Sequence, residues 1–506
     1  MFELRDYQLK AHELIYEKFR ANLKTLLVMA TGSGKSKTIV SFIEKIHKHF
    51  IIILVVKNRK LVNQLAADTK LFNLDYGVFM ANHDEYDDTK LIQVCSIDTI
   101  NTRGQHPHIS STKDIVLIID EADQAKSSTY QSAINRYLNR GYARTFLLGM
   151  TATPYNGLDF FDCFINPITP LELKERGFLV DYKYYIPKHS IDLGNVEIKR
   201  GEWVGSQISK KMNTPTMIKH SFTAWLDYGD SRQTLVFCSS KQHAEDFRDY
   251  INNYYKKEVA AFVFDKTSDA DRISIFKKFE SGVLRFLINI KIITRGVDIP
   301  CIGTILDLAA TLNANLHIQK LGRGSRKNDF YTDCIVIDPV KNLINNGHFY
   351  QHREITLEVP KKRSKKDLED IMMRVCDKCF RAEEPQAFGK NNICPFCGHC
   401  NKPLPTKKLS KSAKEKIFLE SASEEVIEQR QMIKDFKKIL WLNQYGPKQK
   451  VKFTYQVAKE KAVIKMLEKY GKEKCLTIKK SIGLTDEILN QWEEMYNYVP
   501  LGGLYE

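Results

Sequence analysis

The sequence predicts an α/β protein with two consecutive parallel sheets flanked by helices, followed by a cysteine module and a helical tail. Short apolar runs bounded by turn signals alternate with amphipathic stretches from about residue 25 to 150, and the alternation restarts after about residue 230. Strands that alternate with helices favour parallel sheets covered by those helices. At 506 residues the chain also exceeds what one hydrophobic core usually supports. We therefore expect two α/β domains and smaller additional units.

The expected domain boundaries lie where these patterns change. The first α/β domain is expected at 1–165 and the second at 166–345. The basic break PKKRSKKDLED indicates a linker at 346–370, crowded cysteines indicate a metal module at 371–401, and Lys-rich helical periodicity indicates a basic helical domain at 402–506. The expected strands of the first domain are TLLVMATG, IIILVV, LIQVCS, IVLIIDEAD and TFLLGMTAT, and those of the second are VDYKYYIP, QTLVFCSS, VAAFVF, LRFLINI, IGTILDL and DCIVIDP.

The composition is typical of a globular protein with a polyanionic partner. The chain is 43% hydrophobic and 27% charged, with a formal net charge of +16 and a pI near 9.1. Clustered Lys and Arg displace counterions from phosphate backbones, so this charge favours nucleic acid. No window approaches the roughly 18 consecutive apolar residues of a membrane span, and the N-terminus MFELRDYQLK is charged where a signal peptide is apolar. We expect no membrane partner and a chain that stays in the compartment where it is made.

The segment LLVMATGSGKSKTIVSFIEKI places a glycine-rich turn between an apolar strand and an amphipathic helix. Such a turn lets backbone N–H groups face phosphate oxygens, and the helix N-terminus adds favourable partial charge. Lys35 is expected to hold the β- and γ-phosphates of ATP and Ser36 to ligate magnesium, although Met29 replaces the first glycine of GxxxxGK[ST]. An incidental turn is the alternative. The phosphate-binding candidates are Thr31, Gly32, Ser33, Gly34, Lys35 and Ser36.

Two adjacent acids end a buried-strand pattern about 85 residues later. After a phosphate loop, Asp120 is expected to organise magnesium and Glu121 to orient and deprotonate the attacking water, whereas solvated loop acids are the alternative. Near the N-terminus, LRDYQLKAHELIYEKF is typical of an amphipathic helix. Arg5 and Gln8 precede the loop by about 25 residues. The Gln8 amide can recognise an adenine edge, with ordinary helix surface as the alternative.

The second domain contains the segments ITRGVDIP and HIQKLGRGSRKN, and in the latter Gln319, Gly322, Arg323 and Arg326 have the spacing QxxGRxxR. Arginines three residues apart lie on one face of a helical turn. Their planar donors suit phosphate oxygens in a transition state, so these arginines and Gln319 are catalytic candidates. Nine motifs occur in order, and residues 1 to about 340 resemble the two RecA-like domains of a superfamily 2 helicase of the DEAD/DEAH type. The motifs are the Gln8 region, MATGSGKS, VVKNRKLVNQ, CSIDTI, DEAD, TAT, LVFCSS, TRGVD and QKLGRGSR.

The resemblance implies that ATP binds between the two domains and that a nucleic-acid strand runs across both. Arg323 and Arg326 would be arginine fingers, and Asp298 would contact the ribose. Thr151 and Thr153 would couple hydrolysis to nucleic-acid binding. Closing the cleft around ATP and opening it after hydrolysis would shift the domains along the strand. The implied strand contacts, which suit phosphates and carry no base sequence, are Lys57, Arg59, Gln64, Ser96, Thr99, Ser239, Thr294 and Arg295.

Residues 120–123 spell DEAD, yet neighbouring motifs depart from the RNA-helicase pattern of that name. TAT stands where that family has SAT, Gln319 stands where it has His, and MATGSGKS replaces AQTGSGKT. These departures favour the DNA-directed branch that includes RecG-, UvsW- and restriction-translocase-like proteins. With its basic linker and cysteine module, the chain is most similar to RadD-like helicases of bacteria and phages. That similarity implies a cytoplasmic location, in a bacterial cell or a phage-infected host.

The cysteine module contains two CxxC knuckles separated by fourteen residues. The expected ligands are Cys376, Cys379, Cys394 and Cys397. Four thiolates at this spacing suit tetrahedral zinc, and Gly398 fits a zinc-ribbon turn. His399 and Cys400 are alternative ligands. A closed four-thiolate site would be structural, because the module is too small for its own core.

The sequence therefore predicts an ATP-dependent DNA translocase or helicase with ATP, magnesium and zinc as cofactors. It would act on branched or partly single-stranded DNA in repair, recombination or replication, and a single-strand-binding or recombination protein is a candidate partner. The alternatives are an ATP-dependent RNA helicase, a DNA-binding adaptor with little motor activity, and the motor subunit of a restriction or defence system. Intact Lys35, Asp120 and Glu121 argue against the adaptor. We recognise no nuclease or methyltransferase motif, so a defence motor would need a partner for cleavage.

Overall fold

The computed structural model describes residues 3–57, 59–103, 107–141, 143–154, 158–290, 299, 301–358 and 372–402, and the single positions 463, 467 and 475. The chain divides into two compact units, Met1–Lys402 and Pro403–Glu506. The first unit contains both α/β domains and the cysteine module. The predicted helical domain at 402–506, apart from those single positions and its first residue, lies outside the described residues, as does the predicted linker from 359 onward.

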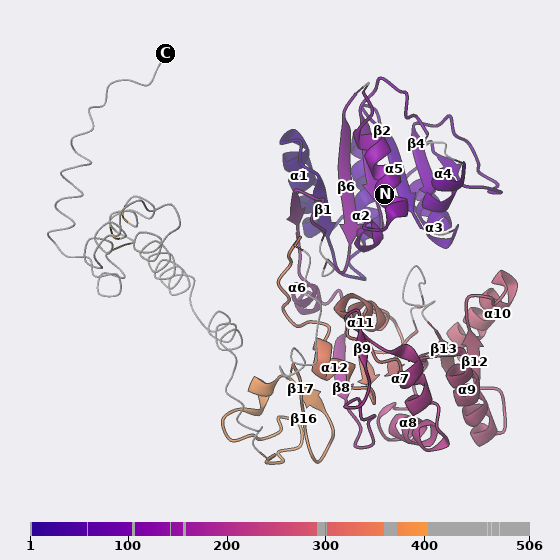
Figure 1. The fold of residues 1–506 in the computed structure, drawn as a ribbon, viewed down its shortest axis with the longest axis vertical. Coiled ribbons are helices and arrows are strands. Elements are labelled where there is room, and N and C mark those ends of the chain that lie inside the picture. The colour runs from indigo at the N-terminus through magenta and orange to yellow at the C-terminus, as the bar shows by residue number, and fades with distance from the viewer. Residues whose placement is uncertain are drawn as a thin grey trace. The chain divides into compact units, whose positions relative to one another are not determined.

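A seven-stranded parallel sheet forms the first α/β domain (Figure 1), with strand order β3-β4-β2-β5-β6-β1-β7. The phosphate-loop segment follows β1 and the acid pair follows β5, and both strands pair with β6. The two predicted halves of the nucleotide site therefore emerge at the same edge of one sheet. The strands are β1 (Thr25–Val28), β2 (Ile51–Val56), β3 (Gly77–Phe79), β4 (Ile92–Ser96), β5 (Ile115–Ile119), β6 (Thr145–Thr151) and β7 (Cys163–Ile165).

Helices cover both faces of this sheet because successive strand residues point to opposite sides. In β2, Ile52 and Leu54 belong to one buried cluster, whereas Ile51, Ile53 and Val55 belong to another. The first cluster includes the apolar faces of α1 (Asp6–Arg20), α2 (Lys35–Ile46) and α3 (Arg59–Leu71), and the second includes those of α4 (Ile97–Arg103) and α5 (Ser128–Leu138). The predicted α/β class and the five predicted strands of this domain are confirmed.

A six-stranded parallel sheet forms the second domain, with strand order β12-β13-β11-β14-β15-β8. All six predicted strands are present. They are β8 (Asp181–Tyr185), β11 (Thr234–Phe237), β12 (Ala260–Val263), β13 (Phe286–Asn289), β14 (Thr304–Asp307) and β15 (Asp333–Ile337). One face packs against α7 (Gly205–Met212), α8 (Pro215–Tyr228) and α9 (Lys241–Tyr255), and the other against α10 (Asp269–Glu280), α11 (Ala314–Leu321) and α12 (Asn342–Asn346).

Several short elements lie outside these two sheets. Helix α6 (Pro170–Glu175) lies between β7 of the first sheet and β8 of the second. A hairpin of β9 (Ile198–Lys199) and β10 (Glu202–Trp203) precedes α7. The 3-10 turns are η1 (Ala122–Gln124) and η3 (Pro385–Phe388). No helix within the described residues is long and apolar enough to cross a membrane.

The cysteine module packs against β8, which is the edge strand of the second sheet. Its own hairpin comprises β16 (Arg374–Val375) and β17 (Ala382–Glu383). The Ile186 amide donates to the Phe380 carbonyl at 3.0 Å, and His348 contacts the Glu384 carboxylate at 2.6 Å. The module therefore covers an edge that would otherwise offer unpaired backbone groups.

Candidate nucleotide pocket and metal centre

A pocket of about 450 Å³ lies where the first sheet's phosphate-loop edge meets the loop after α11. It collects predicted residues that are as far apart in sequence as Arg5 and Arg326. In open parallel sheets, ligands bind at the carboxyl ends of the strands, where this pocket lies. The residues predicted for nucleotide binding or hydrolysis that lie on its wall are Arg5, Thr31, Gly32, Gly34, Lys35, Ser36, Asp120, Glu121, Arg323 and Arg326.

The phosphate loop depends on two glycines with left-handed backbone. Gly32 has φ +84° and Gly34 has φ +81°, and α2 begins at the next residue, Lys35. A Cβ atom at Gly34 would lie 2.8 Å from Nε2 of Gln8. The Ser33 carbonyl accepts a hydrogen bond from the Tyr7 hydroxyl at 2.9 Å. The loop therefore holds a shape that needs glycine, and its helix N-terminus opens into the pocket.

Gln8 supports the phosphate loop through hydrogen bonds of its side chain. Its side chain is 3% exposed. Its Oε1 accepts from the Arg5 amide at 2.9 Å, and its Nε2 donates to Oγ1 of Thr38 at 3.1 Å. Both ends of the amide thus have partners inside the protein, and recognition of adenine by Gln8 stays a prediction. Arg5, in contrast, is exposed and lines the pocket.

The acid pair sits at a strained turn after β5. The Asp120 amide donates to the Val55 carbonyl at 3.1 Å, and the Glu121 amide donates to Oδ1 of Asp120 at 2.9 Å. Glu121 has φ +48° and ψ +50°, a left-handed conformation that is uncommon for a residue with a side chain and recurs at functional sites.

The charge around Asp120 fits a divalent cation. Burial, and next the Glu121 carboxylate, raise the pKa of Asp120 to about 6, while the Lys35 ammonium opposes the rise. Two carboxylates crowded on a pocket wall are stabilised by a bound cation. The Ser36 hydroxyl lines the same wall, and oxygen ligands of this kind are those that Mg²⁺ prefers. Ser36 and Asp120 are therefore the residues that would hold magnesium.

A chain of hydrogen bonds joins the second sheet to the first. Gln319 on α11 donates from Nε2 to Oγ1 of Thr153 at 3.1 Å. The Thr153 amide donates to Oγ1 of Thr151 at 3.0 Å, and the Thr151 carbonyl accepts from the Met29 amide at 3.0 Å. Both threonines are fully buried. This chain links α11 to the strand that leads into the phosphate loop, and the coupling of hydrolysis to nucleic-acid binding by the two threonines stays a prediction.

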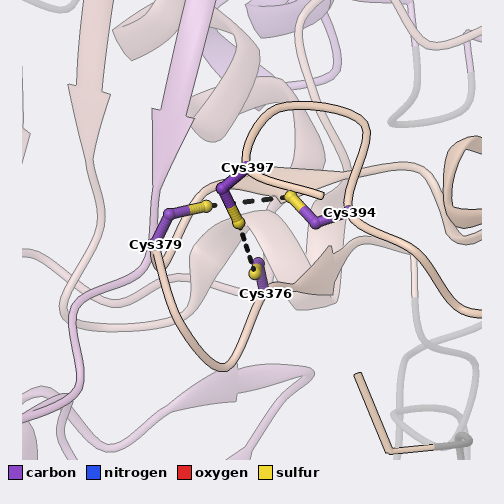
Figure 2. A group of neighbouring side chains, drawn as sticks. All are labelled: Cys376, Cys379, Cys394 and Cys397. Atoms are coloured by element: carbon purple, nitrogen blue, oxygen red, sulfur yellow. Dashed lines mark hydrogen bonds between the residues drawn. The ribbon is translucent and has the colours of Figure 1, made fainter. Parts of the chain in front are cut away.

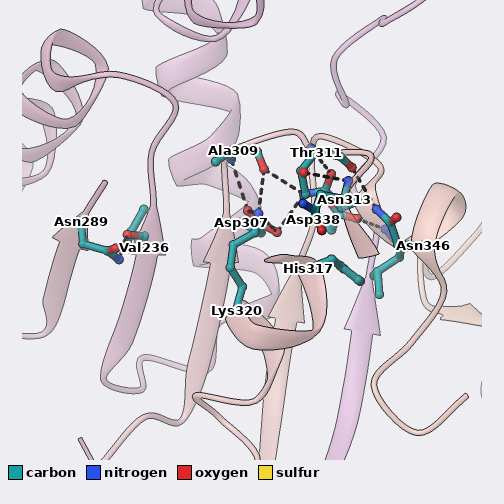
Figure 3. Close-up of polar contacts among 12 residues, drawn as sticks. Val236, Asn289, Asp307, Ala309, Thr311, Asn313, His317, Lys320, Asp338 and Asn346 are labelled. Atoms are coloured by element: carbon teal, nitrogen blue, oxygen red, sulfur yellow. Dashed lines mark hydrogen bonds and ion pairs between the residues drawn. The ribbon is translucent and has the colours of Figure 1, made fainter. Parts of the chain in front are cut away.

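A buried ion pair fixes α11 on the second sheet. Lys320 is 2% exposed and Asp307, at the end of β14, is 1% exposed. The Lys320 ammonium donates to both Asp307 carboxylate oxygens, at 2.6 and 2.7 Å, and to the Ala309 carbonyl at 2.7 Å (Figure 3). All three of its donors are therefore satisfied, and Asn342 also donates to Asp307, at 2.8 Å.

The loop that leads into α11 is held from the β9–β10 hairpin. The Glu202 carboxylate accepts from Oγ1 of Thr311 at 2.6 Å and from the Leu312 amide at 2.7 Å. On α12, Asn342 accepts from the Thr311 amide at 2.8 Å, and Asn346 donates to the Thr311 carbonyl at 2.9 Å. Sequence reasoning missed this support and the Lys320 pair. Lys320 lies inside a recognised motif, but its partners are separated from it in sequence.

The predicted nucleic-acid residues of the first domain do not form one group. Lys57 is exposed after β2, whereas Arg59 donates to two backbone carbonyls of the loop after β3. Ser96 and Thr99 are buried, 5% and 7% exposed, at the end of β4 and in α4. Gln64 lines the nucleotide pocket. Contact of any of these residues with a strand stays a prediction.

The predicted contacts of the second domain are partly described. Ser239 follows β11, and its hydroxyl lies 3.0 Å from Nδ1 of His243. Its contact with a strand also stays a prediction. The predicted residues outside the described part of the chain are Thr294, Arg295 and Asp298.

The cysteine module brings four sulfurs together, and Figure 2 shows their side chains pointing toward one another. The ligand atoms of Cys376, Cys379, Cys394 and Cys397 all lie within 4.8 Å of one another. Two of the sulfur–sulfur distances are 3.6 and 3.7 Å. A tetrahedron with Zn–S bonds of about 2.3 Å has edges of about 3.8 Å, so the four thiols fit zinc.

The two knuckles share one backbone geometry. The Phe380 amide donates to the Cys376 carbonyl and the Gly398 amide donates to the Cys394 carbonyl, both at 3.0 Å. Phe380 and Gly398 both have positive φ, +58° and +66°. The alternative ligand Cys400 is exposed and, like His399, does not belong to the described four-cysteine group.

Two family models match the chain. The model described as "Type III restriction enzyme, res subunit" matches residues 1–156, and the model described as "Helicase conserved C-terminal domain" matches residues 218–328. The matched segments contain the phosphate loop and acid pair in one case, and Gln319, Arg323 and Arg326 in the other.

Three relatives align with most of the chain. IRC3 of Saccharomyces cerevisiae, named as an ATP-dependent helicase, is 26% identical over 66% of this chain and 51% of its own length. A 51.5 kDa protein of a Lactococcus phage is 26% identical over 73% of this chain and 76% of its own. The DNA 3'-5' translocase XPB2 of Sulfurisphaera tokodaii is 23% identical over 65% of this chain and 79% of its own. The chain thus spans about half the length of the yeast relative.

Magnesium affinity is expected to depend on the protonation of Asp120. Because its pKa is raised to about 6, a proton competes with the cation below that pH. Apparent Mg²⁺ affinity should fall about tenfold per unit below pH 6 and be nearly constant above pH 7. Titration calorimetry of Mg²⁺ into the protein saturated with ADP, between pH 5 and 8, measures this affinity. Asp120→Asn should bind magnesium weakly at every pH, and an equal pH dependence in that variant would contradict the assignment.

Replacement of Lys320 by Met should destabilise the second domain, because Asp307 would be left buried without its cation. The expected loss is about 3–5 kcal/mol in the free energy of unfolding, measured by urea denaturation. Lys241→Met is the matched control, since Lys241 forms an exposed pair with Glu245 at 3.5 Å. It should cost less than about 0.5 kcal/mol. Equal losses in the two variants would refute the structural role of the pair.

Zinc is expected at one ion per chain, bound by the four-cysteine group. Replacement of Cys394 by Ser should remove most of the zinc, measured by atomic absorption on the purified protein, and lower the melting temperature. Cys400→Ser is the control and should keep the full zinc content, because Cys400 is exposed and outside the group. Zinc loss in the Cys400 variant, or its full retention in the Cys394 variant, would contradict the assignment.

Proposed function

The chain belongs to the superfamily 2 helicases of the DEAD/DEAH type, and from this premise we propose that it is an ATP-driven DNA translocase or helicase. The observation that carries the proposal is the composition of the pocket wall. The phosphate loop and acid pair come from the first sheet, and Arg323 and Arg326 come from the second. Such a site is complete only when both domains face the same nucleotide, so ATP binding and hydrolysis would change how the domains sit.

The residues on the pocket wall would have different roles in hydrolysis. Lys35 and the loop amides would bind the β- and γ-phosphates, and Glu121 would orient the attacking water and accept its proton. Magnesium, when bound through Ser36 and Asp120, would supply charge neutralisation at the phosphate oxygens. Arg323 and Arg326 would add planar donors to the charge that develops during transfer.

Coupling to the strand would run through α11. The hydrogen bond from Gln319 to Thr153 connects the helix that precedes the arginines to the end of β6. Loss of the γ-phosphate would change the position of Arg323 and, through α11, of this contact. A small shift of one domain against the other is the step that moves the strand.

DNA is the proposed substrate. The TAT and Gln319 departures from the RNA-helicase pattern favour it, the net charge of +16 suits a phosphate backbone, and the relative XPB2 is named as a DNA translocase. We place the activity on branched or partly single-stranded DNA in repair, recombination or replication, as in the RadD-like branch. A single-strand-binding or recombination protein would be its partner.

A motor subunit of a restriction or defence system is the second candidate. The model that matches residues 1–156 is described as the res subunit of a type III restriction enzyme, which favours this alternative. Such a motor would need a partner for cleavage. Copurification with a nuclease or methyltransferase would favour this alternative over a repair role without changing the proposed motor activity.

Single-stranded DNA should stimulate ATP hydrolysis at least about tenfold, and RNA of the same length should stimulate it less, because the motor couples cleft closure to DNA. Hydrolysis is measured by phosphate release, and translocation by displacement of a triplex-forming strand. Lys35→Ala and Glu121→Gln should abolish both while leaving the melting temperature within a few degrees of the wild-type value. Strict dependence on RNA would instead identify an RNA helicase, and full translocation by the Lys35 variant would exclude an ATP-driven motor.

A further inference from the structure

The segment that enters β8 contributes to the nucleotide pocket, although no motif marks it. Residues 177–180, here called the strap, follow α6 and connect the first sheet to the second. Phe178 lines the pocket together with Arg5 and Lys35. The strap therefore touches the nucleotide site at the point where the chain passes between the domains.

The Phe178 ring supports the guanidinium of Arg5. The Arg5 Cζ lies 3.9 Å from the ring centroid of Phe178, a stacking distance for a planar cation on an aromatic face. Arg5 also donates from Nη1 to the Tyr7 hydroxyl at 2.9 Å, and that hydroxyl donates to the Ser33 carbonyl at 2.9 Å. The guanidinium is thus fixed relative to the phosphate loop and lies over the Phe178 ring.

Arg5 also belongs to the wall of the nucleotide pocket. Arg5 is exposed and lines the pocket that contains Lys35 and Ser36. A nucleotide whose phosphates lie on the loop would extend its base toward one of the pocket's other walls. Guanidinium planes stack on aromatic rings, and a purine offers a larger face than a pyrimidine.

The backbone of the strap pairs with the loop that carries Arg326. The Val180 amide donates to the Ser325 carbonyl at 3.0 Å, and Leu179 forms an antiparallel bridge with Arg326. On the other side, Leu179 packs so tightly on the phosphate loop that a Cβ at Gly32 would lie 2.8 Å from its Cδ2. One short segment thus contacts the Arg5 end of the pocket, the phosphate loop and the arginine-finger loop.

We propose that Phe178 is a positioning residue for base recognition, which holds the Arg5 guanidinium flat against the purine of the bound nucleotide. A stacked base would then stabilise the position of the strap and, through it, the position of Arg326. This inference rests on the proposed ATPase activity and adds a base-specificity determinant outside the recognised motifs. A base that stacks poorly on Arg5 would leave the strap and Arg326 less well placed, so base identity should affect kcat as well as KM.

The test compares hydrolysis of ATP and UTP by the full chain and by four variants. Phe178→Leu keeps apolar bulk but removes the aromatic face, Phe178→Tyr keeps the face, and Arg5→Ala removes the stacked cation. Arg5→Ala with Phe178→Leu closes a double-mutant cycle. Leu171→Ala is the control, because Leu171 lies on the neighbouring α6, is 44% exposed and does not line the pocket.

The readout is the ratio of kcat/KM for ATP to that for UTP. A sample that is partly misfolded lowers both rates equally, so the ratio is insensitive to folding. Phe178→Leu should lower the ratio about tenfold, with a rise in KM and a fall in kcat for ATP. Phe178→Tyr and the control should keep the wild-type ratio, and Phe178→Leu should cause no further loss in the Arg5→Ala background.

Three results would overturn the inference: an unchanged ATP-to-UTP ratio in Phe178→Leu, a lowered ratio in Phe178→Tyr, or a ratio in the double variant that is lowered by the product of the two single effects. Equal use of ATP and UTP by the wild-type protein would also overturn it. None of these results bears on DNA stimulation of the wild-type ATPase, which tests the proposed function separately. Titration calorimetry with ADP and UDP repeats the comparison without hydrolysis. The ratio of the two binding affinities must rank the variants in the same order as the ratio of kcat/KM.

Discussion

The ion pair between Lys320 and Asp307 fixes the helix on which the nucleotide pocket depends. The Lys320 ammonium is 2% exposed, so separating it from the Asp307 carboxylate would cost a large free energy. Helix α11 therefore has one stable rotation on the second sheet. That rotation directs Gln319 to Thr153 of the first sheet and places Arg323, one turn later, on the pocket wall. If α11 could rotate about its axis, Gln319 would no longer point toward Thr153 and Arg323 would no longer lie on the pocket wall. The buried charge thus fixes the position of the arginines that are proposed to act in hydrolysis.

The two sheets are joined by apolar as well as polar contacts. One apolar cluster covers a face of each sheet and continues from one sheet to the other, and two further clusters cover the remaining faces. Between the sheets, polar contacts such as the Gln319–Thr153 hydrogen bond are individually worth only about 0.5–1.5 kcal/mol. A nucleotide that bridges the phosphate loop and the arginines can therefore decide whether these contacts form. In the proposed motor, polar contacts of this kind would change as the two domains move.

Much of this architecture could be predicted, because its signals are local. Apolar runs such as IIILVV become strands, and the glycine-rich turn ending at Lys35 becomes a loop and helix start with positive φ at Gly32 and Gly34. The four cysteines converge as their spacing predicts. The sequence could not show contacts between distant segments, such as Glu202 with Thr311 or Phe178 with Arg5. It also did not indicate that Gln64, assigned to the nucleic-acid strand, lines the nucleotide pocket, because the approach of helix α3 to the phosphate loop is a contact between distant segments.

In the proposed ATP site, residues of the second domain complete a site that is built on the first. Nucleotide binding and single-turnover hydrolysis by Arg323→Ala, in the presence of single-stranded DNA, distinguish this arrangement from a site confined to the first domain. We expect near-normal MgATP affinity, because the phosphate loop is intact, together with a hydrolysis rate lower by at least about a thousandfold. Hydrolysis at the wild-type rate would show instead that the first domain is sufficient for the chemistry.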